Sequence, residues 1–203
     1  MITLHETAVS GNCYKVRLLL AQLDIPLRRV EFDIAALKAG QTHTEAFLAM
    51  NPEGRVPVAE LEDGTFLPES NAILVYFAEG TPFLPADRLE RAHVMRWLFW
   101  EQYSHEPYVA VVRAWRCYFG IPAGREAELP VREARGHAAL DVLERTLARQ
   151  RFLVGERYTV ADIALYVYTH VAGEGGFEMA RYPAVGAWLA RVAAQPKHIA
   201  ITD

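Results

Sequence analysis

The chain changes character at residues 81–88, TPFLPADR, a stretch that holds two prolines. Before this stretch, short strand patterns alternate with helical ones, whereas no later segment has a convincing strand pattern. A length of 203 residues is enough for two small domains. We therefore predict an α/β domain over residues 1–80, a linker over 81–88 and an all-helical domain over 89–203.

The first 80 residues predict the order β-α-β-α-β-β-α, which is typical of an α/β layer domain with helices on both faces of the sheet. Asn51-Pro52 stops one helix, Glu62-Asp63-Gly64 predicts a hairpin turn, and Ser70 is a good N-cap for a helix that Gly80 ends. The predicted strands cover residues 1–6, 26–34, 55–61 and 65–69, and the predicted helices cover 13–23, 44–52 and 71–80.

The second half predicts long helices around a buried central one. Pro107 is expected to bend or interrupt the first helical pattern, residues 88–115. Thr159 and Asp162 form a capping-box pair, and the helix that they open has few polar positions, so it should lie at the centre of the domain. Further helical patterns cover residues 130–150 and 183–194.

Composition narrows the function classes. A formal charge of −4 gives no electrostatic argument for nucleic acid or for an anionic membrane surface. The longest apolar runs are far shorter than the roughly 20 residues of a membrane span. The amino terminus lacks the pattern of a signal peptide, and two cysteines are too few for a disulfide framework, so we expect a cytoplasmic protein. The seven histidines form no metal-ligand spacing, so no metal site is expected.

Pro57 lies inside a strand pattern, RVPVAEL, where it removes a donor from the hydrogen-bond ladder. Either the strand is an edge or a chain end, or the Val56-Pro57 bond is cis, although only about 5–6% of X-Pro bonds are. Helices are predicted to open near Ser10 and near Ser70. Two helix N-termini and an unpaired strand segment would suit a small peptide carrying carboxylates, with Glu69 available for an ammonium group.

These segments together resemble the glutathione transferase family over essentially the whole chain. The resemblance rests on SGNCYKVR, NPEGRVPV, LPESNAILVYF, the helical second half and FLVGERYTVADIAL. It implies a thioredoxin-like N-terminal domain, a helical-bundle C-terminal domain, glutathione as co-substrate, a small electrophilic second substrate and a homodimer. The exposed face of residues 71–80 and the first C-terminal helix are the expected dimer surfaces.

The same resemblance implies a set of glutathione-binding residues. The backbone of Val56 would pair with the cysteinyl unit, with Pro57 in cis, and Glu69 with Ser70 would hold the γ-glutamyl end. Among residues 41–43, Thr42 is our first choice for the glycyl carboxylate and His43 our second.

Three residues compete to stabilise the glutathione thiolate. Ser10 occupies the place of the serine of serine-type classes, although a turn hydroxyl that caps the helix would look the same. Asn12 matches an asparagine that assists in some bacterial members, and an asparagine N-cap is also ordinary structure. Cys13 could be reactive at a helix start, but it lies one position beyond the cysteine of cysteine-type members and suits a buried site. We select Ser10, with Asn12 assisting.

The second substrate is expected to meet aromatic side chains from the first long C-terminal helix. Tyr108 and Trp115 lie seven residues apart, hence on one helix face, and are our choices for the pocket. An aromatic stripe at this spacing is more often core. Arg113 could bind an acidic substrate, but a solvated arginine is the expectation.

The resemblance leaves several activities open. The first is transfer of glutathione to an electrophile, and the second is glutathione-dependent disulfide reduction, because Asn12 and a cysteine-free catalytic position leave every sulfur to glutathione. A non-catalytic binding module is a further alternative, although the chain keeps Ser10 and the Glu69-Ser70 pair. Only part of the SSCSWRVR motif of maleylacetoacetate isomerases survives in SGNCYKVR, so isomerisation ranks below these.

Overall fold

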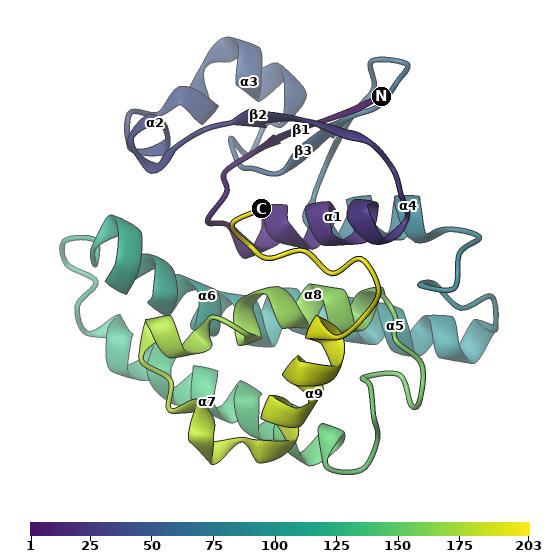
Figure 1. Cartoon of the computed structure of the whole chain (residues 1–203). Helices are drawn as coiled ribbons and strands as arrows, with labels where there is room; N and C mark the ends of the chain where they lie inside the picture. The colour runs from purple at the N-terminus through teal and green to yellow at the C-terminus, as the bar shows by residue number, and fades with distance from the viewer. The chain divides into compact units, whose positions relative to one another are not determined.

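A computed structural model describes residues 1–203, which divide into two compact units. The first unit comprises Met1–Glu79 together with Pro196–Asp203, and the second comprises Gly80–Gln195 (Figure 1). No helix in either unit combines the length and the apolar character that crossing a membrane requires.

The first unit is built on a mixed sheet of four strands in the order β2-β1-β3-β4. β1 runs parallel to β2 and antiparallel to β3, and β3 runs antiparallel to β4. Leu4 and Ala59 are paired across β1 and β3 and are both fully buried, so one face of the sheet is core. The strands are β1 (Ile2–Glu6), β2 (Leu27–Glu31), β3 (Val58–Glu60) and β4 (Phe66–Pro68).

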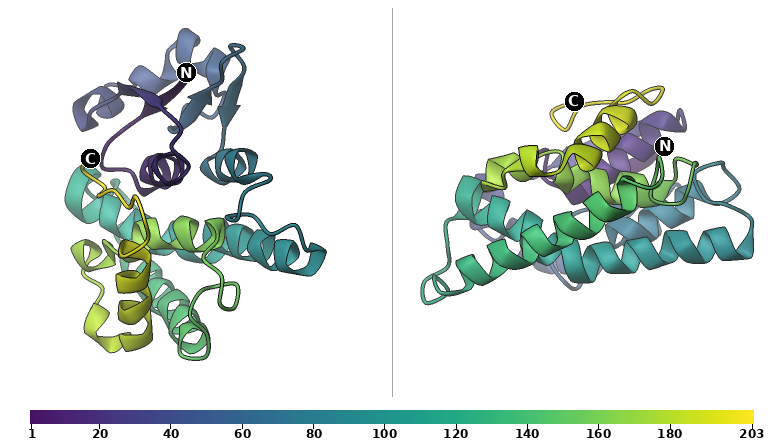
Figure 2. Two further views of the ribbon diagram at one scale, coloured as in Figure 1. Left: turned by 45° about the vertical axis from the view of Figure 1, so that its right-hand side comes forward. Right: turned by 90° about the horizontal axis from the view of Figure 1, so that it is seen from below.

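Helices cover both faces of this sheet, as predicted (Figure 1). α1 and α4 lie side by side below it, seen end-on in the left panel of Figure 2, and α2 and α3 lie above it. Val16 of α1 and Ile73 of α4 join Leu4 and Ala59 in one apolar cluster. The sequence analysis missed the short α2. The helices are α1 (Gly11–Gln22), α2 (Ile34–Lys38), α3 (Glu45–Met50) and α4 (Ser70–Ala78), with a 3₁₀ turn, η1 (Gln41–His43), before α3.

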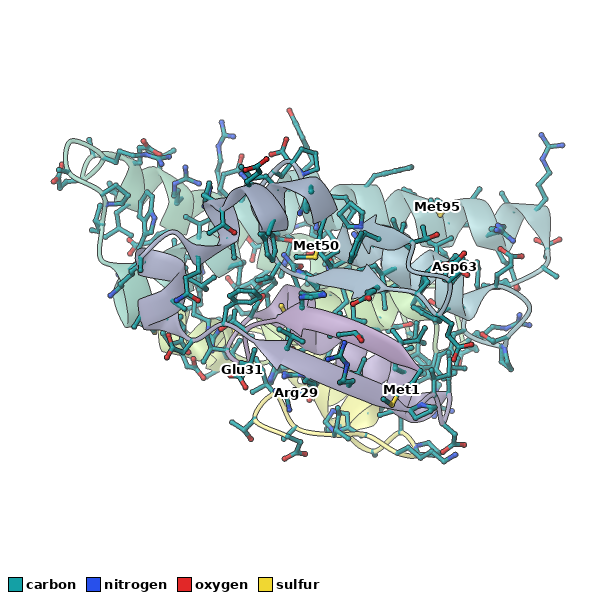
Figure 3. The ribbon with its side chains drawn as sticks, turned by 90° about the horizontal axis from the view of Figure 1, so that it is seen from above. Met1, Arg29, Glu31, Met50, Asp63 and Met95 are labelled. Carbon is teal, nitrogen blue, oxygen red and sulfur yellow. The ribbon has the colours of Figure 1, made fainter.

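Residues 196–203 belong to the first unit, whereas the sequence analysis assigned them to the helical domain. Polar side chains of the first unit bind their carbonyl groups: Tyr14 Oη donates to Ile199 O at 2.6 Å and Arg17 Nη2 to Ile201 O at 2.7 Å. Arg29 of β2, labelled in Figure 3, donates to Asp203 O at 2.7 Å. Hydrogen bonds between residues so far apart in sequence leave no local pattern to read.

All regular elements of the second unit are helices, apart from isolated β-bridges at residues 152–157. The predicted helix over 88–115 is divided into two by a π-helical segment, η2 (Glu101–His105). Pro107 follows this segment and cannot donate the backbone hydrogen bond that a continuous helix would need, which accounts for the break. The helices are α5 (Arg88–Trp100), α6 (Glu106–Ala114), α7 (Glu128–Leu147), α8 (Val160–Thr169) and α9 (Pro183–Ala193), with a second π-helical segment, η3 (Trp115–Phe119), after α6.

The central helix α8 begins with the predicted capping box, and every residue of it is buried. Asp162 is also fully buried and accepts hydrogen bonds from outside the helix, from Leu153 N and from Trp188 Nε1, both at 2.9 Å. A carboxylate in the core therefore ties α8 to the preceding loop and to α9.

Candidate functional site

Ser10 is the N-cap of α1. Its backbone is extended, with φ −78° and ψ 125°, and its Oγ accepts a hydrogen bond from Cys13 N at 3.4 Å. This cap uses a lone pair of the hydroxyl oxygen and leaves the hydroxyl proton able to donate to another acceptor. Capping and binding a sulfur anion are therefore compatible roles for one serine.

Asn12, on the first turn of α1, meets the start of α4. The hydroxyl of Ser70 donates to Asn12 Oδ1 at 3.2 Å. Asn12 is half-buried and Ser70 is buried. The structure thus brings together the two helix starts that the sequence marked, and with them the positive ends of two helix dipoles.

Lys15 is a residue of this site that the sequence analysis missed. Its side chain is fully buried, and Nζ donates to Ser70 Oγ at 3.2 Å and to Asn71 Oδ1 at 3.0 Å. The sequence did carry a signal for Lys15, since it lies among the apolar residues of CYKVRLLLAQL. A buried lysine is rare unless it has partners, so this position could have marked a polar site.

Glu69 is exposed and precedes Ser70 with φ 69° and ψ 105°. The sequence predicted Ser70 as the N-cap of this helix, but Glu69 holds that position and Ser70 is the first helical residue. A non-glycine residue at positive φ costs about 1–3 kcal/mol, and such residues cluster at ligand sites. The backbone here turns so that the Glu69 carboxylate lies in solvent beside the start of α4.

The loop before β3 contains Val56 and Pro57, and their peptide bond is cis. β3 begins at Val58, one residue after the proline, so Pro57 removes no donor from the ladder, and the prediction of a strand through residue 57 was wrong. Asn51 braces the loop from within, since its Nδ2 donates to Arg55 O at 2.7 Å. Val56 is half-buried and Pro57 is buried.

Thr42 and His43 lie beside this loop. Thr42 is buried and His43 is exposed, with 3.3 Å between Thr42 Oγ1 and His43 Nδ1. Gly54 has φ +63°, and a Cβ there would lie 2.9 Å from His43 Nε2 and 3.0 Å from the carbonyl oxygen of Thr42. Glycine at position 54 therefore lets the two loops approach each other.

Cys13 does not present a thiolate. Its side chain is fully buried, and burial raises the pKa of its thiol to about 12, against smaller opposing effects of hydrogen bonds from Thr7 N and from the Ser10 side chain. The thiol is therefore protonated at neutral pH. Nowhere in residues 1–203 do three or more histidine, cysteine, aspartate or glutamate side chains gather as metal ligands could.

Tyr108 and Trp115 belong to the helical unit. Tyr108 lines two adjoining hollows, one of about 490 Å³ between α6 and α7 and one of about 270 Å³ that residues of α5 and η2 also line. Its hydroxyl accepts a hydrogen bond from Arg135 Nη1 at 2.6 Å. Trp115 is 7% exposed and lies 4.9 Å from the guanidinium of Arg132, which lines the larger hollow. Arg113 is buried and pairs with Glu174 at 2.7 Å, so the expectation of a solvated arginine was wrong.

Comparison with known proteins identifies the family. Residues 4–83 match the glutathione S-transferase N-terminal domain and residues 109–196 the C-terminal domain. A glutathione S-transferase from Pseudomonas fluorescens Pf-5 is 50% identical, with a TM-score of 0.95 over 100% of this chain and 99% of that one. The disulfide-bond oxidoreductase YfcG of Escherichia coli K12 is 29% identical over 93% of this chain and 89% of its own length.

A more distant structure shares the fold and holds a ligand. The glutathione transferase URE2P6 of Phanerochaete chrysosporium, solved with oxidized glutathione, is 24% identical, with a TM-score of 0.85 over 97% of this chain and 92% of that one. Both domain matches and the close structural relative lead to one conclusion: the chain belongs to the glutathione S-transferase family.

Proposed function

We propose that the protein is an enzyme that binds glutathione in its first unit and stabilises the glutathione thiolate with Ser10 and Asn12. The observation that carries the proposal is the meeting of the α1 and α4 starts, where the Asn12 amide contacts Ser70 and the Ser10 hydroxyl caps the same start of α1. Glutathione supplies the sulfur nucleophile for attack on a small electrophile.

The residues of the first unit suit the chemical groups of glutathione. Helix N-termini with free N–H groups favour carboxylates, and the exposed Glu69 carboxylate beside α4 suits the ammonium of the γ-glutamyl end. The backbone of Val56, two residues before the ladder of β3 begins, is available to a peptide. Thr42 and His43, packed beside Gly54, supply a hydroxyl and an imidazole for the glycyl carboxylate.

The thiolate needs only modest help from the protein. A thiol with a pKa near 8.5 that is lowered by two units needs about 2.7 kcal/mol of preference for the anion. A charge-assisted hydrogen bond contributes about 1.5–3 kcal/mol, and a helix N-terminus about 0.3–1 kcal/mol. One donor from Ser10 or Asn12 at the start of α1 is therefore enough without a general base.

Disulfide reduction is the second candidate reaction. The burial of Cys13 favours it, because a protein whose active-site cysteine is protonated leaves all the sulfur chemistry to glutathione. The relationship to a disulfide-bond oxidoreductase supports the same reading. In this reaction two glutathione thiols are oxidised to one disulfide, while the substrate disulfide takes up two electrons and two protons.

The test is glutathione binding by calorimetry, with the thiolate absorbance followed across pH, in the native protein and in Ser10→Ala and Asn12→Ala. We expect the native protein to lower the thiol pKa below 8.5 and each variant to raise it again. Turnover with an aryl halide and with hydroxyethyl disulfide then separates conjugation from reduction. If the native protein binds no glutathione, the proposal is wrong; binding without turnover of either substrate supports a binding module.

The second substrate and a second copy of the chain are assigned to separate surfaces. We assign the electrophile to the larger hollow at Tyr108, which Arg132 also lines, with the Trp115 ring against the Arg132 guanidinium; Tyr103 lines only the smaller hollow. Tyr76 on α4 is 54% exposed and Tyr103 in η2 is 83% exposed, which supports a homodimer through aromatic surfaces. Tyr103→Glu should shift the protein toward the monomer in sedimentation velocity, and an unchanged sedimentation coefficient would contradict this surface.

A further inference from the structure

Arg135 of α7 lines both of the hollows at Tyr108 and is paired with no carboxylate. Its polar contact is with Tyr108: Nη1 donates to the phenol oxygen at 2.6 Å, and the guanidinium lies 5.3 Å from the centre of the ring. Arg113, which the sequence suggested for an acidic substrate, is instead buried and paired with Glu174. Of these two arginines, Arg135 is the one whose charge is open to a ligand.

Glu128 is the only acidic residue that lines either hollow, and other arginines bind both of its oxygens. Arg125 donates to Oε1 at 2.6 Å and to Oε2 at 2.9 Å, and Arg132 donates to Oε2 at 2.8 Å. These bonds lower the pKa of the Glu128 carboxyl to about 2, so the group is ionised and already satisfied at neutral pH. Two guanidinium groups face this one carboxylate, and Arg135 adds a further positive charge to the larger hollow.

Tyr108 supplies a second hydrogen-bond donor beside Arg135. An arginine can only donate, so the phenol oxygen accepts from Arg135 and the phenol proton is not used in that bond. The half-buried tyrosine ring lies against the guanidinium, and a planar guanidinium held in this way loses less freedom when it binds a ligand. The two residues therefore offer adjacent donors to the two oxygens of one carboxylate.

The remaining residues of the larger hollow are apolar. They are Pro107, Ala127 and Val131, and Val131 is 56% exposed. The volume of about 490 Å³ lies within the range of about 300–1,000 Å³ that is typical of small-molecule sites. The hollow thus suits a small ligand with an apolar body and one anionic group.

We propose that the second substrate is an electrophile that carries a carboxylate, which Arg135 and Tyr108 bind while the apolar body of the substrate lies against Val131. The inference rests on the proposed function and deepens it, because it names the class of substrate for the hollow assigned there. The flat fork of a guanidinium matches the geometry of a carboxylate. A neutral electrophile of the same shape would fill the apolar part of the hollow and leave these donors to water.

The first test measures binding without glutathione and without a reaction. Calorimetry compares 3,5-dinitrobenzoate with its neutral analogue 3,5-dinitrobenzamide, neither of which has a leaving group. The variants are Arg135→Met, Arg135→Lys and Tyr108→Phe. The matched control is Arg145→Met, which removes the same charge from an exposed position of α7 that lines neither hollow. Thermal unfolding shows whether each variant is folded.

We expect the native protein to bind the carboxylate about tenfold more tightly than the amide, the lower limit for a hydrogen bond to a charged group, because Arg135 is exposed. Arg135→Met should remove this preference and leave the affinity for the amide unchanged. Arg135→Lys should keep part of the preference, since an ammonium keeps the charge without the fork. Tyr108→Phe should reduce it, and Arg145→Met should match the native protein.

The second test measures turnover of glutathione with 4-chloro-3,5-dinitrobenzoate and with the corresponding amide. The glutathione sulfur forms a bond to the ring carbon that carries chlorine, chloride leaves with the electron pair of the broken bond, and the thiol proton passes to solvent. Arg135→Met should lower kcat/KM for the carboxylate about tenfold and leave kcat/KM for the amide unchanged, in line with the loss in binding.

Equal affinity of the native protein for the two ligands, or a preference that Arg135→Met leaves intact, would show that the inference is wrong. Should Arg135→Met fail to fold, an unchanged preference in both Arg135→Lys and Tyr108→Phe overturns it as well. The proposed function fails separately: a native protein that prefers the carboxylate in the binding test but turns over neither chloride supports the carboxylate site and refutes the transferase. Equal turnover of both chlorides by the native protein and by Arg135→Met refutes the inference and leaves the transferase standing.

Discussion

The Glu6 carboxylate and the Arg17 guanidinium lie 3.1 Å apart in a site closed to solvent, with 0% and 2% of their side chains exposed. Arg17 also donates to the carbonyl groups of Ala8 and Ile201, at 3.1 and 2.7 Å. Arg29 approaches the same carboxylate from the neighbouring strand. One buried ion pair therefore connects β1, α1, β2 and residues 196–203 of the first unit.

Removing one partner of this pair should destabilise the protein strongly. Arg17→Met leaves Glu6 buried with one of its cations lost, which we expect to lower the free energy of unfolding by about 3–5 kcal/mol, measured by urea denaturation. Arg28→Met is the control, because the Arg28–Glu60 pair is 3.9 Å apart and Arg28 is 55% exposed; its cost should stay below about 1 kcal/mol. Equal losses in the two variants would contradict the prediction.

The two cysteines should react very differently with iodoacetamide. Cys117 is exposed, whereas Cys13 is buried with its thiol pKa raised to about 12 by burial. At pH 8 we expect mass spectrometry to find one alkyl group, on Cys117, and a second only after denaturation, since the thiolate is the reactive form. The Cys13→Ala variant should keep the glutathione affinity of the native protein. Rapid alkylation of Cys13 in the folded protein would instead show that Cys13 is accessible and reactive.

The Asp162→Ala substitution should destabilise the helical unit more than any surface substitution does. The substitution removes the acceptor of Leu153 N, Thr159 N and Trp188 Nε1, all buried donors. Each unsatisfied group costs about 1–3 kcal/mol, so we expect a loss of about 4 kcal/mol or more. Asp141→Asn, at an exposed position on α7, should lie within about 0.5 kcal/mol of the native protein. The loss is measured by urea denaturation, and a small loss in Asp162→Ala would show that water replaces these bonds.

Acid should weaken the attachment of residues 196–203. Partial burial lowers the pKa of His198, against an opposing effect of Asp203. The folded chain thus takes up the proton less readily than the unfolded chain, whose histidine titrates near 6.5. The stability from this group is complete above about pH 6.5 and is lost as pH falls below it. Between pH 7.5 and 5 the melting temperature should fall further in the native protein than in His198→Gln; equal falls would assign the effect to other groups.

The sequence predicted those parts of the fold that local patterns encode. Ser10 and Thr159 are capping residues that predicted the starts of two helices, and the structure has both. The alternation of strands and helices gave the α/β class of the first unit, and the apolar helix after Thr159 gave the centre of the second. Such features depend on neighbours a few residues apart, which a sequence displays directly.

The parts that were missed depend on partners far away in the chain. Lys15 finds Ser70 and Asn71 more than fifty residues later, and Tyr14 finds Ile199. A lysine or a tyrosine on an apolar helix does not say where its polar atom will be satisfied. The π-helical segment before Pro107 was missed for another reason, since a proline marks the break in a helix without specifying how the preceding turn adjusts.

The return of residues 196–203 to the first unit has a consequence for biosynthesis. The ribosome adds these residues only after all of α5–α9, so a nascent first unit carries Tyr14 and Arg17 without the carbonyl groups that they bind in the finished protein. The unit that begins to form first is thus the later of the two to be completed. During translation the amino-terminal half must therefore keep its binding surface for residues 196–203 open while the helical half emerges and packs.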